Sequence, residues 1–196
     1  ECDVLVAMNA AALKANLRHL RKGGTIIANS DGFDPKNLRL ANYADGINPI
    51  TDGSLENFRL ITIDVTKMTR AALTESGMGI KEIDRAKNMF VLGFLYWMYN
   101  RELNYTENFL NEKFGKKPDV LEANLKVLKA GYNFGETSET IADRYIVNPA
   151  PMAPGTYRNI MGNQATALGL IAASQKCGLD LFLGSYPITP ATDILH

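Results

Sequence analysis

The sequence is poor in the residues that build metal centres. It contains 2 cysteines and 2 histidines among 196 residues. Cys2 and Cys177 stand near opposite ends of the chain, form no C-x-x-C pair and have no histidine at the spacing of a zinc ligand. Neither a zinc site nor a complete set of iron–sulfur ligands is therefore expected. We expect both cysteines to be buried, reduced thiols.

The chain also lacks an excess of charge of either sign. Lysine plus arginine and aspartate plus glutamate each number 21, so the formal net charge is 0. A neutral chain has no overall field that would attract nucleic acid or an anionic membrane. We therefore expect neither as a partner, and expect small ligands or other proteins instead.

Long hydrophobic runs are missing as well. The most apolar stretch, residues 89–99, is interrupted by Gly93 and ends at Asn100 and Arg101. It falls short of the roughly 20 apolar residues that a membrane helix needs. Nothing in the sequence resembles a signal peptide. These observations predict a cytoplasmic location.

The two ends of the sequence predict a piece of a longer protein. An apolar run begins at Val4 without a starting methionine, and residues 193–196 read as the first turn of a helix that stops. We interpret both ends as cuts through folded structure. We therefore expect the chain to be catalytically incomplete by itself.

What the sequence does contain is the composition of a folded protein, with 46% hydrophobic and 21% charged residues. Asn9 is expected to cap a first helix, Gly23 and Gly24 to end it, and Asp64 or Thr66 to cap a second helix. Short apolar runs predict strands at residues 4–7, 25–28 and 58–63, with helices at residues 10–20 and 68–74. This alternation predicts an α/β fold with a parallel or mixed sheet.

The second half of the chain is dominated by helical patterns. Apolar residues recur at spacings of three and four, and predict helices at residues 81–98, 105–114 and 120–130, the last ended by Gly131. A stretch rich in Pro and Gly follows at residues 134–158 and predicts a linker. After it we expect a helix at residues 163–176, ended by Gly178, and a strand at residues 179–185.

The segment after that strand predicts an anion-binding point. Pro190 suits the first turn of a helix, which makes Thr189 the N-cap residue. The Thr189 hydroxyl, the free N–H groups of the first turn and the positive end of the helix dipole would then converge, and such a point binds a carboxylate or a phosphate. An ordinary capped helix after an ordinary strand is the alternative interpretation.

Two motifs in this region resemble a known family. Tyr186-Pro187-Ile188-Thr189-Pro190, followed by a small residue and a threonine, resembles the alpha-subunit signature of the 2-oxoacid:ferredoxin oxidoreductases. The segment 162–169 resembles the Gly-Asn-x-Ala-x-Ala-x-Gly helix that opens the pyrimidine-binding domain of the same proteins. Segments 2–9, 23–27 and 88–93 resemble, more loosely, the gamma domain that some members fuse in front of alpha.

The resemblance implies a fold and a domain organisation. Residues 1–133 would be an N-terminally truncated gamma domain with three αβα layers, a parallel or mixed sheet and a helix-rich second half. Residues 134–158 would be the linker. Residues 159–196 would be the beginning of a C-terminally truncated, thiamine-diphosphate pyrimidine-binding α/β domain.

The resemblance also implies an activity. The parent enzyme would oxidatively decarboxylate a 2-oxoacid, with 2-oxoglutarate favoured by the fused gamma-alpha arrangement, to an acyl-CoA. CoA would be the co-substrate, and an iron–sulfur protein, ferredoxin, the electron acceptor. Thiamine diphosphate with Mg²⁺ would be shared with a partner beta subunit, which would hold the iron–sulfur cluster.

Site residues follow from the same motif. The resemblance implies that Thr189 contacts the carboxylate of the 2-oxoacid and that Tyr186 helps to shape this substrate site. It also implies that Pro187 and Ile188 line the thiamine pocket. No catalytic residue and no metal ligand is expected within the chain, because the glutamate that hydrogen-bonds the aminopyrimidine lies beyond the signature helix. Gln164 stands where many relatives carry glutamate.

Two other functions remain open. The helices in residues 81–130 could dock subunits in a non-catalytic interaction module. The opening strand-helix-strand pattern could belong to a nicotinamide-dependent Rossmann dehydrogenase, although residues 8–12 stand where that family carries G-x-G-x-x-G.

Overall fold

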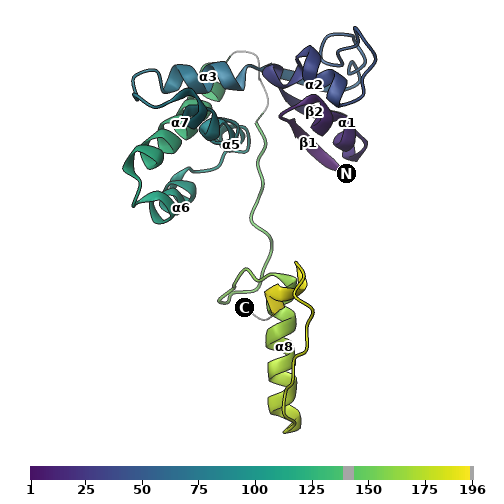
Figure 1. Cartoon of the computed structure of the whole chain (residues 1–196), viewed down its shortest axis with the longest axis vertical. Coiled ribbons are helices and arrows are strands. Elements are labelled where there is room, and N and C mark those ends of the chain that lie inside the picture. The colour runs from purple at the N-terminus through teal and green to yellow at the C-terminus, as the bar shows by residue number, and fades with distance from the viewer. Residues whose placement is uncertain (139–143, 195–196) are drawn as a thin grey trace. The chain divides into compact units, whose positions relative to one another are not determined.

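Three short strands pair into a parallel sheet in the computed structural model, which describes residues 1–138 and 144–194. They are β1 (Cys2–Ala7), β2 (Leu20–Asn29) and β3 (Arg59–Ile63), with β2 in the middle. Both neighbours run parallel to β2 (Figure 1). Parallel neighbours cannot be joined by a tight hairpin, so the chain crosses over between them through helices and loops. The α/β prediction is confirmed, and so are its three strands in residues 1–63, although β2 begins at Leu20 and not at residue 25.

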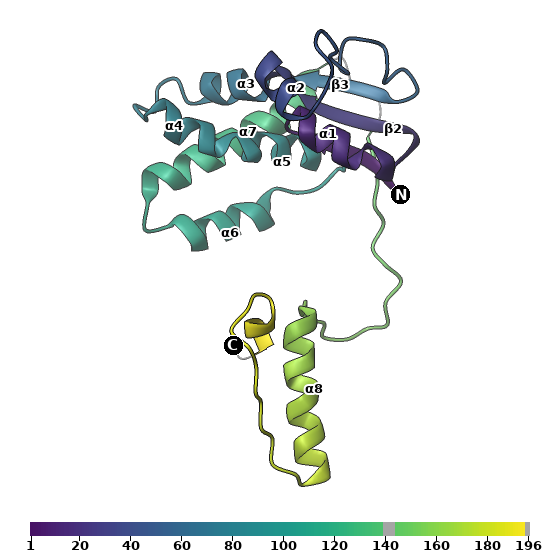
Figure 2. The ribbon, with the colours of Figure 1, turned by 45° about the vertical axis from the view of Figure 1, so that its right-hand side comes forward.

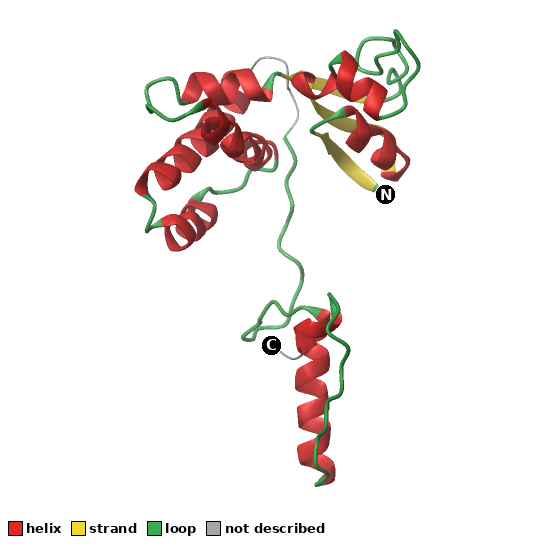
Figure 3. Cartoon of the chain, in the orientation of Figure 1, coloured by secondary structure: helices red, strands yellow, loops and turns green. Residues whose placement is uncertain are grey.

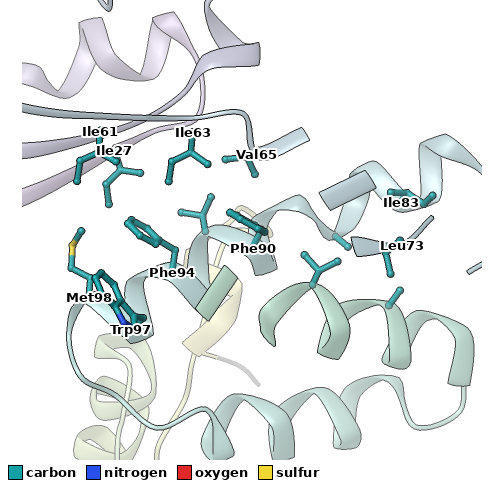
Figure 4. Close-up of a cluster of buried hydrophobic side chains, with 14 residues drawn as sticks. Ile27, Ile61, Ile63, Val65, Leu73, Ile83, Phe90, Phe94, Trp97 and Met98 are labelled. Atoms are coloured by element: carbon teal, nitrogen blue, oxygen red, sulfur yellow. The ribbon is translucent and has the colours of Figure 1, made fainter. Parts of the chain in front are cut away.

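The side chains of β2 point alternately into two hydrophobic cores. Ile26 packs with Leu13 on one face of the sheet, whereas Ile27 packs with Phe90 and Phe94 on the other. Neighbouring residues of a strand face opposite sides, so the sheet is covered by helices on both faces. Figure 4 shows the second core, in which both phenylalanines are fully buried. Full burial of a phenylalanine side chain stabilises a fold by about 1.5–3 kcal/mol.

Seven helices accompany the sheet in the described part of residues 1–148, and Figure 3 shows them in red. They are α1 (Ala10–Asn16), α2 (Pro35–Leu40), α3 (Val65–Ala72), α4 (Ile80–Ile83), α5 (Lys87–Met98), α6 (Asn104–Phe114) and α7 (Pro118–Thr137). Two predicted caps are confirmed. The Asn9 side chain accepts the Ala12 N–H at 2.8 Å, and the Asp64 carboxylate accepts the Lys67 N–H at 2.9 Å.

The helices α5 and α7 cross very closely. A methyl group added at Gly93 would lie 1.9 Å from the Leu128 carbonyl oxygen, and one added at Gly131 would lie 1.9 Å from that of Phe90. The prediction that Gly131 ends its helix is therefore wrong. Gly131 sits inside α7, which continues to Thr137, because the glycine lets the two backbones approach. The first residues of the predicted linker, 134–137, are consequently helical.

Two further predictions about the first unit are corrected. Gly23 and Gly24 do not end the first helix, which stops at Asn16 and is followed by a short 3₁₀ turn. Both glycines belong to β2, where Gly23 has φ +71° and donates its N–H to the Asn57 carbonyl at 3.2 Å. The cysteines are free, but Cys2 is half-buried and Cys177 is exposed, so the expectation of two buried thiols is wrong.

Residues 149–196 form a second compact unit. Its helix α8 (Gly162–Cys177) ends at Gly178, which has φ +67°, as predicted. The chain then turns back along α8 (Figure 2). The predicted strand at residues 179–185 is absent, and the next element is a 3₁₀ helix, η4 (Ala191–Ile194).

Parts of two predictions fall outside the described residues, namely positions 139–143 of the linker and positions 195–196 of the terminal helix. None of the helices in the described part of the chain combines the length and the apolar character that crossing a bilayer requires.

Candidate functional site

The predicted site residues lie on the surface of the second unit, in the segment that leads to η4. Tyr186 is 78% exposed and Ile188 is 57% exposed. Pro187 and Thr189 are exposed as well. The backbone between them is tightly folded, because the Ile188 N–H donates to the Tyr186 carbonyl at 2.8 Å. The segment thus presents a phenol, a hydroxyl and two apolar side chains from one short stretch of chain.

A side chain from α8 holds this segment in place. The Asn163 amide nitrogen donates to the Pro190 carbonyl at 2.9 Å, across 27 positions of sequence. The first turn of α8 is itself closed by Gln164, whose side-chain oxygen accepts the Met161 N–H at 3.4 Å. The two motifs that carry the family resemblance are therefore in contact. Sequence reasoning included Asn163 in its motif but gave it no role.

The strand-to-helix joint predicted at Thr189 is wrong. Residues 179–185 form no strand, because a strand needs a neighbour to pair with and the described residues of this unit offer none. The helix begins at Ala191 and is a short 3₁₀ helix, so Thr189 lies in the turn before it and does not cap an α-helix. The Thr189–Pro190 peptide bond is cis. The Thr192 N–H donates to the Ile188 carbonyl at 3.2 Å, so it is not free to bind an anion.

The surface of the second unit is strongly apolar. Leu168, Leu170 and Ile171 of α8 are 57%, 42% and 46% exposed, and Phe182 of the returning segment is 92% exposed. A helix that is apolar on all sides is normally buried within a larger protein. The unit therefore has the surface of an incomplete core.

The residues present fit one part of thiamine diphosphate and not another. Tyr186, Pro187 and Ile188 offer the apolar surface against which an aromatic pyrimidine packs, and Thr189 offers a hydroxyl donor. The negative charge of a diphosphate is balanced by Mg²⁺, which carboxylate oxygens of the protein would help to hold. Within residues 1–138 and 144–194, no group of three or more His, Cys, Asp and Glu side chains is placed to hold a metal ion. The segment can therefore line the pyrimidine end of such a site.

The carboxyl end of the parallel sheet is a second place where an α/β fold gathers polar groups. The Asn29 side chain, which is buried, accepts the Val65 N–H at 3.1 Å, and Thr66 donates to the Asp31 carboxylate at 2.8 Å. Gly32 lies so close to the Met8 carbonyl that an added methyl group would be 2.1 Å from its oxygen. The two bonds join the ends of β2 and β3, and the close approach of Gly32 to Met8 brings in the end of β1, so the role of these contacts is structural.

Comparisons with known proteins identify similar chains. Residues 1–134 match the protein family described as pyruvate ferredoxin/flavodoxin oxidoreductase. The chain is 50% identical over 194 residues to the 2-oxoglutarate oxidoreductase subunit KorA of Mycobacterium tuberculosis, covering 99% of this chain and 29% of that protein. It is 22% identical over 135 residues to subunit alpha of the 2-oxoacid:ferredoxin oxidoreductase 1 of Aeropyrum pernix, covering 69% of this chain and 20% of that protein.

A solved structure is similar over the whole chain. It is the 2-oxoglutarate:ferredoxin oxidoreductase from Magnetococcus marinus with 2-oxoglutarate, coenzyme A and succinyl-CoA bound. The TM-score is 0.67 and the identity 25%, over 100% of this chain and 29% of that chain. The chain thus spans less than a third of the length of each of these relatives.

Proposed function

Because the chain belongs to the pyruvate ferredoxin/flavodoxin oxidoreductase family, we propose that it is part of a 2-oxoacid:ferredoxin oxidoreductase that acts on 2-oxoglutarate. The enzyme would oxidatively decarboxylate the 2-oxoacid to an acyl-CoA and pass the electrons to ferredoxin. The 50% identity to a 2-oxoglutarate oxidoreductase subunit over 99% of the chain is the observation that carries this proposal. The bound 2-oxoglutarate and coenzyme A of the M. marinus enzyme support the same substrate class.

The domain assignment is part of the proposal. We keep the boundaries expected from the sequence, residues 1–133 for the gamma domain, 134–158 for the linker and 159–196 for the start of the pyrimidine-binding alpha domain, except that residues 134–137 end α7 and go with the gamma domain. The apolar surface of α8 supports the last assignment, because a longer domain would bury it. The remainder of the enzyme, including the beta subunit with its iron–sulfur cluster, would complete the active site.

Each site residue then has a distinct task. The Thr189 hydroxyl donates a hydrogen bond to the carboxylate of the 2-oxoacid, and the Tyr186 ring shapes the pocket around it. Pro187 and Ile188 would line the pyrimidine end of the thiamine pocket and keep water from it. When bound, thiamine diphosphate supplies the nucleophilic carbon and the electron sink for decarboxylation. Asn163 keeps the segment in position through the Pro190 carbonyl.

The support for Thr189 comes from the motif and from its attachment to α8. A helix dipole plays no part in it, since the residue does not cap an α-helix. Thr189 is an exposed residue of this unit, which leaves it accessible to a substrate. A hydrogen bond to a charged group contributes about 1.5–3 kcal/mol, and this sets the size of the expected effect.

The test uses the full-length enzyme assembled with its partner subunit. We expect Thr189→Val to raise the KM for 2-oxoglutarate, or to lower kcat/KM, about 10- to 100-fold, because valine keeps the shape and loses the hydroxyl. Thr189→Ser keeps a hydroxyl and should stay within about threefold of the unmodified enzyme. Thr156→Val, at an exposed position of the linker, is the matched control. Unchanged kinetics in Thr189→Val would remove Thr189 from the site.

The same assay separates the proposal from the interaction-module alternative. An assembled enzyme whose 2-oxoglutarate oxidation is insensitive to every change at Tyr186 and Thr189 would favour a docking role for this chain. The dehydrogenase alternative has little support, because the turn after β1 contains Asn9 as a helix cap and no glycine-rich loop.

A further inference from the structure

The carboxyl end of α5 is covered by residues from much later in the chain. A helix leaves its last carbonyl groups without partners inside the helix. At α5 the Met98 carbonyl accepts the Tyr145 N–H at 2.7 Å, and the Trp97 carbonyl accepts the Arg144 Nε–H at 3.1 Å in addition to the Asn100 N–H at 3.1 Å. The guanidinium also places a positive charge at the negative end of the helix dipole, where a cation is stabilising.

The Arg144 guanidinium has two more contacts at the same place. Its Nη2 donates to the Asn100 side-chain oxygen at 2.8 Å, and its centre lies 5.4 Å from the centroid of the Trp97 ring. Asn100, two positions after the end of α5, adopts φ +51°, and its side chain meets the arginine there. A planar guanidinium can donate hydrogen bonds to a carbonyl and to an amide oxygen while its face contacts an aromatic ring. A lysine ammonium cannot make these three contacts together.

Tyr145 extends the attachment to the sheet. Its ring stacks on Tyr99, with centroids 5.1 Å apart. Its hydroxyl lies 3.2 Å from the Thr25 hydroxyl, across 120 positions of sequence. Thr25 is on the middle strand β2 and is only 3% exposed, so this hydrogen bond satisfies a buried polar group.

The side chains that follow Tyr145 are exposed to solvent. Ile146 is 75% exposed and Val147 is 56% exposed. Pro149, Pro151 and Pro154 follow in a stretch without helix or strand. The contacts of Arg144 and Tyr145 therefore stand at the boundary between the folded first unit and the extended connection.

We propose that Arg144 and Tyr145 form a latch, a local attachment of the connection to α5 and β2 that opens while the rest of the first unit stays folded. The latch goes beyond the proposed function and does not depend on it. Opening it releases the Trp97 and Met98 carbonyls and the Thr25 hydroxyl from Arg144 and Tyr145.

The experiment measures amide hydrogen exchange and chymotryptic cleavage on the whole chain. In the unmodified protein we expect the Tyr145 amide to exchange about tenfold or more slowly than the Ile146 amide, because its hydrogen bond must open first. Arg144→Ala should accelerate exchange at Tyr145, and cleavage after Tyr145, about tenfold relative to cleavage after Tyr157. Arg85→Ala, which removes an exposed arginine distant in sequence from both tyrosines, should change neither.

A milder pair of variants covers the case in which Arg144→Ala disturbs the whole fold. Tyr145→Phe and Thr25→Val each remove one end of the same hydroxyl pair, while Tyr157→Phe is the matched control for a tyrosine hydroxyl. If the latch exists, both variants accelerate exchange at Tyr145, and the double variant does so no more than the stronger single one. A Tyr145 amide as fast as Ile146 in the unmodified chain, or additive effects in the double variant, would overturn the proposal.

Discussion

The Arg70 guanidinium meets the Asp84 carboxylate at two points, which joins α3 to the turn that follows α4. Nε lies 2.9 Å from one carboxylate oxygen and Nη2 lies 2.8 Å from the other. The hydrogen bonds from Arg70 are the main cause that lowers the pKa of Asp84 below its usual value of 3.8. The same contact raises the pKa of Arg70. Paired geometry of this kind is the form of surface ion pair that most often contributes to stability.

This pair predicts a pH dependence. A carboxyl group with a lowered pKa in the folded state stabilises the fold above its unfolded pKa, and this contribution is lost as the pH falls through the lowered value. We therefore expect Asp84→Asn to be less stable than the unmodified chain at about pH 7 and equally stable at about pH 2, by urea unfolding. The exposed Asp45→Asn is the control. A deficit that persists unchanged at low pH would show that the charge is not its cause.

Single residues were predictable where their partners are near in sequence. The caps at Asn9 and Asp64 bond to amides three positions away, and the local pattern is sufficient to find them. The role expected of Thr189 depended on a strand before it and a helix after it, and neither forms as expected. The bond from Asn163 to Pro190 crosses 27 positions, so no local pattern could predict it.

At the scale of elements, the crossing of α5 and α7 depends on glycine. We expect Gly131→Ala to destabilise the first unit by about 1–3 kcal/mol or more, since the added methyl group would overlap the Phe90 carbonyl oxygen. Gly169→Ala in α8 is the matched control, because nothing lies within 4 Å of its added methyl group. Alanine is the better helix former by about 1 kcal/mol, so this control should not destabilise. Thermal unfolding followed by circular dichroism measures Gly131→Ala, and amide hydrogen exchange in α8 measures Gly169→Ala.

The elements that were predicted correctly are those with a strong periodic pattern and a near partner. The strands β1 and β2 follow each other across one helix, and their short apolar runs predict them. Residues 179–185 have the same kind of run, but a strand also requires a pairing edge, and apolarity alone does not supply one. The interior position of Gly131 was missed because the packing of α5 on α7 is a tertiary contact that overrides a local stop signal.

At the scale of the whole molecule, the two units differ in how much they bury. The large buried side chains, such as Phe90 and Phe94, belong to the first unit, whereas no residue of α8 is buried. We therefore expect a chain of residues 1–148 to unfold cooperatively at a melting temperature within about 3 °C of the full chain. Residues 149–196 alone should show no cooperative transition, because they have no core to lose. A melting temperature lowered by about 10 °C in the shorter chain would contradict this independence.

The α/β class could be predicted from alternating apolar runs and helical patterns, and the family from two short motifs. The three-dimensional relation between those motifs could not, because Asn163 reaches Pro190 only once the chain has turned back along α8. The attachment of Arg144 and Tyr145 to α5 could not be predicted either, because it joins residues that are distant in sequence. Both residues lie in a stretch whose composition predicts a linker.

The two glycines at the crossing of α5 and α7 also fix the position of one helix along the other. Each glycine leaves room for a carbonyl oxygen of the opposite helix. Gly93 faces the carbonyl oxygen of Leu128, and Gly131 faces that of Phe90. Sliding either helix by one position along the other would place a larger side chain against one of these carbonyl oxygens. The two helices therefore pack in a single register. A force applied to the Asn100 end of α5 would therefore displace α7 together with it.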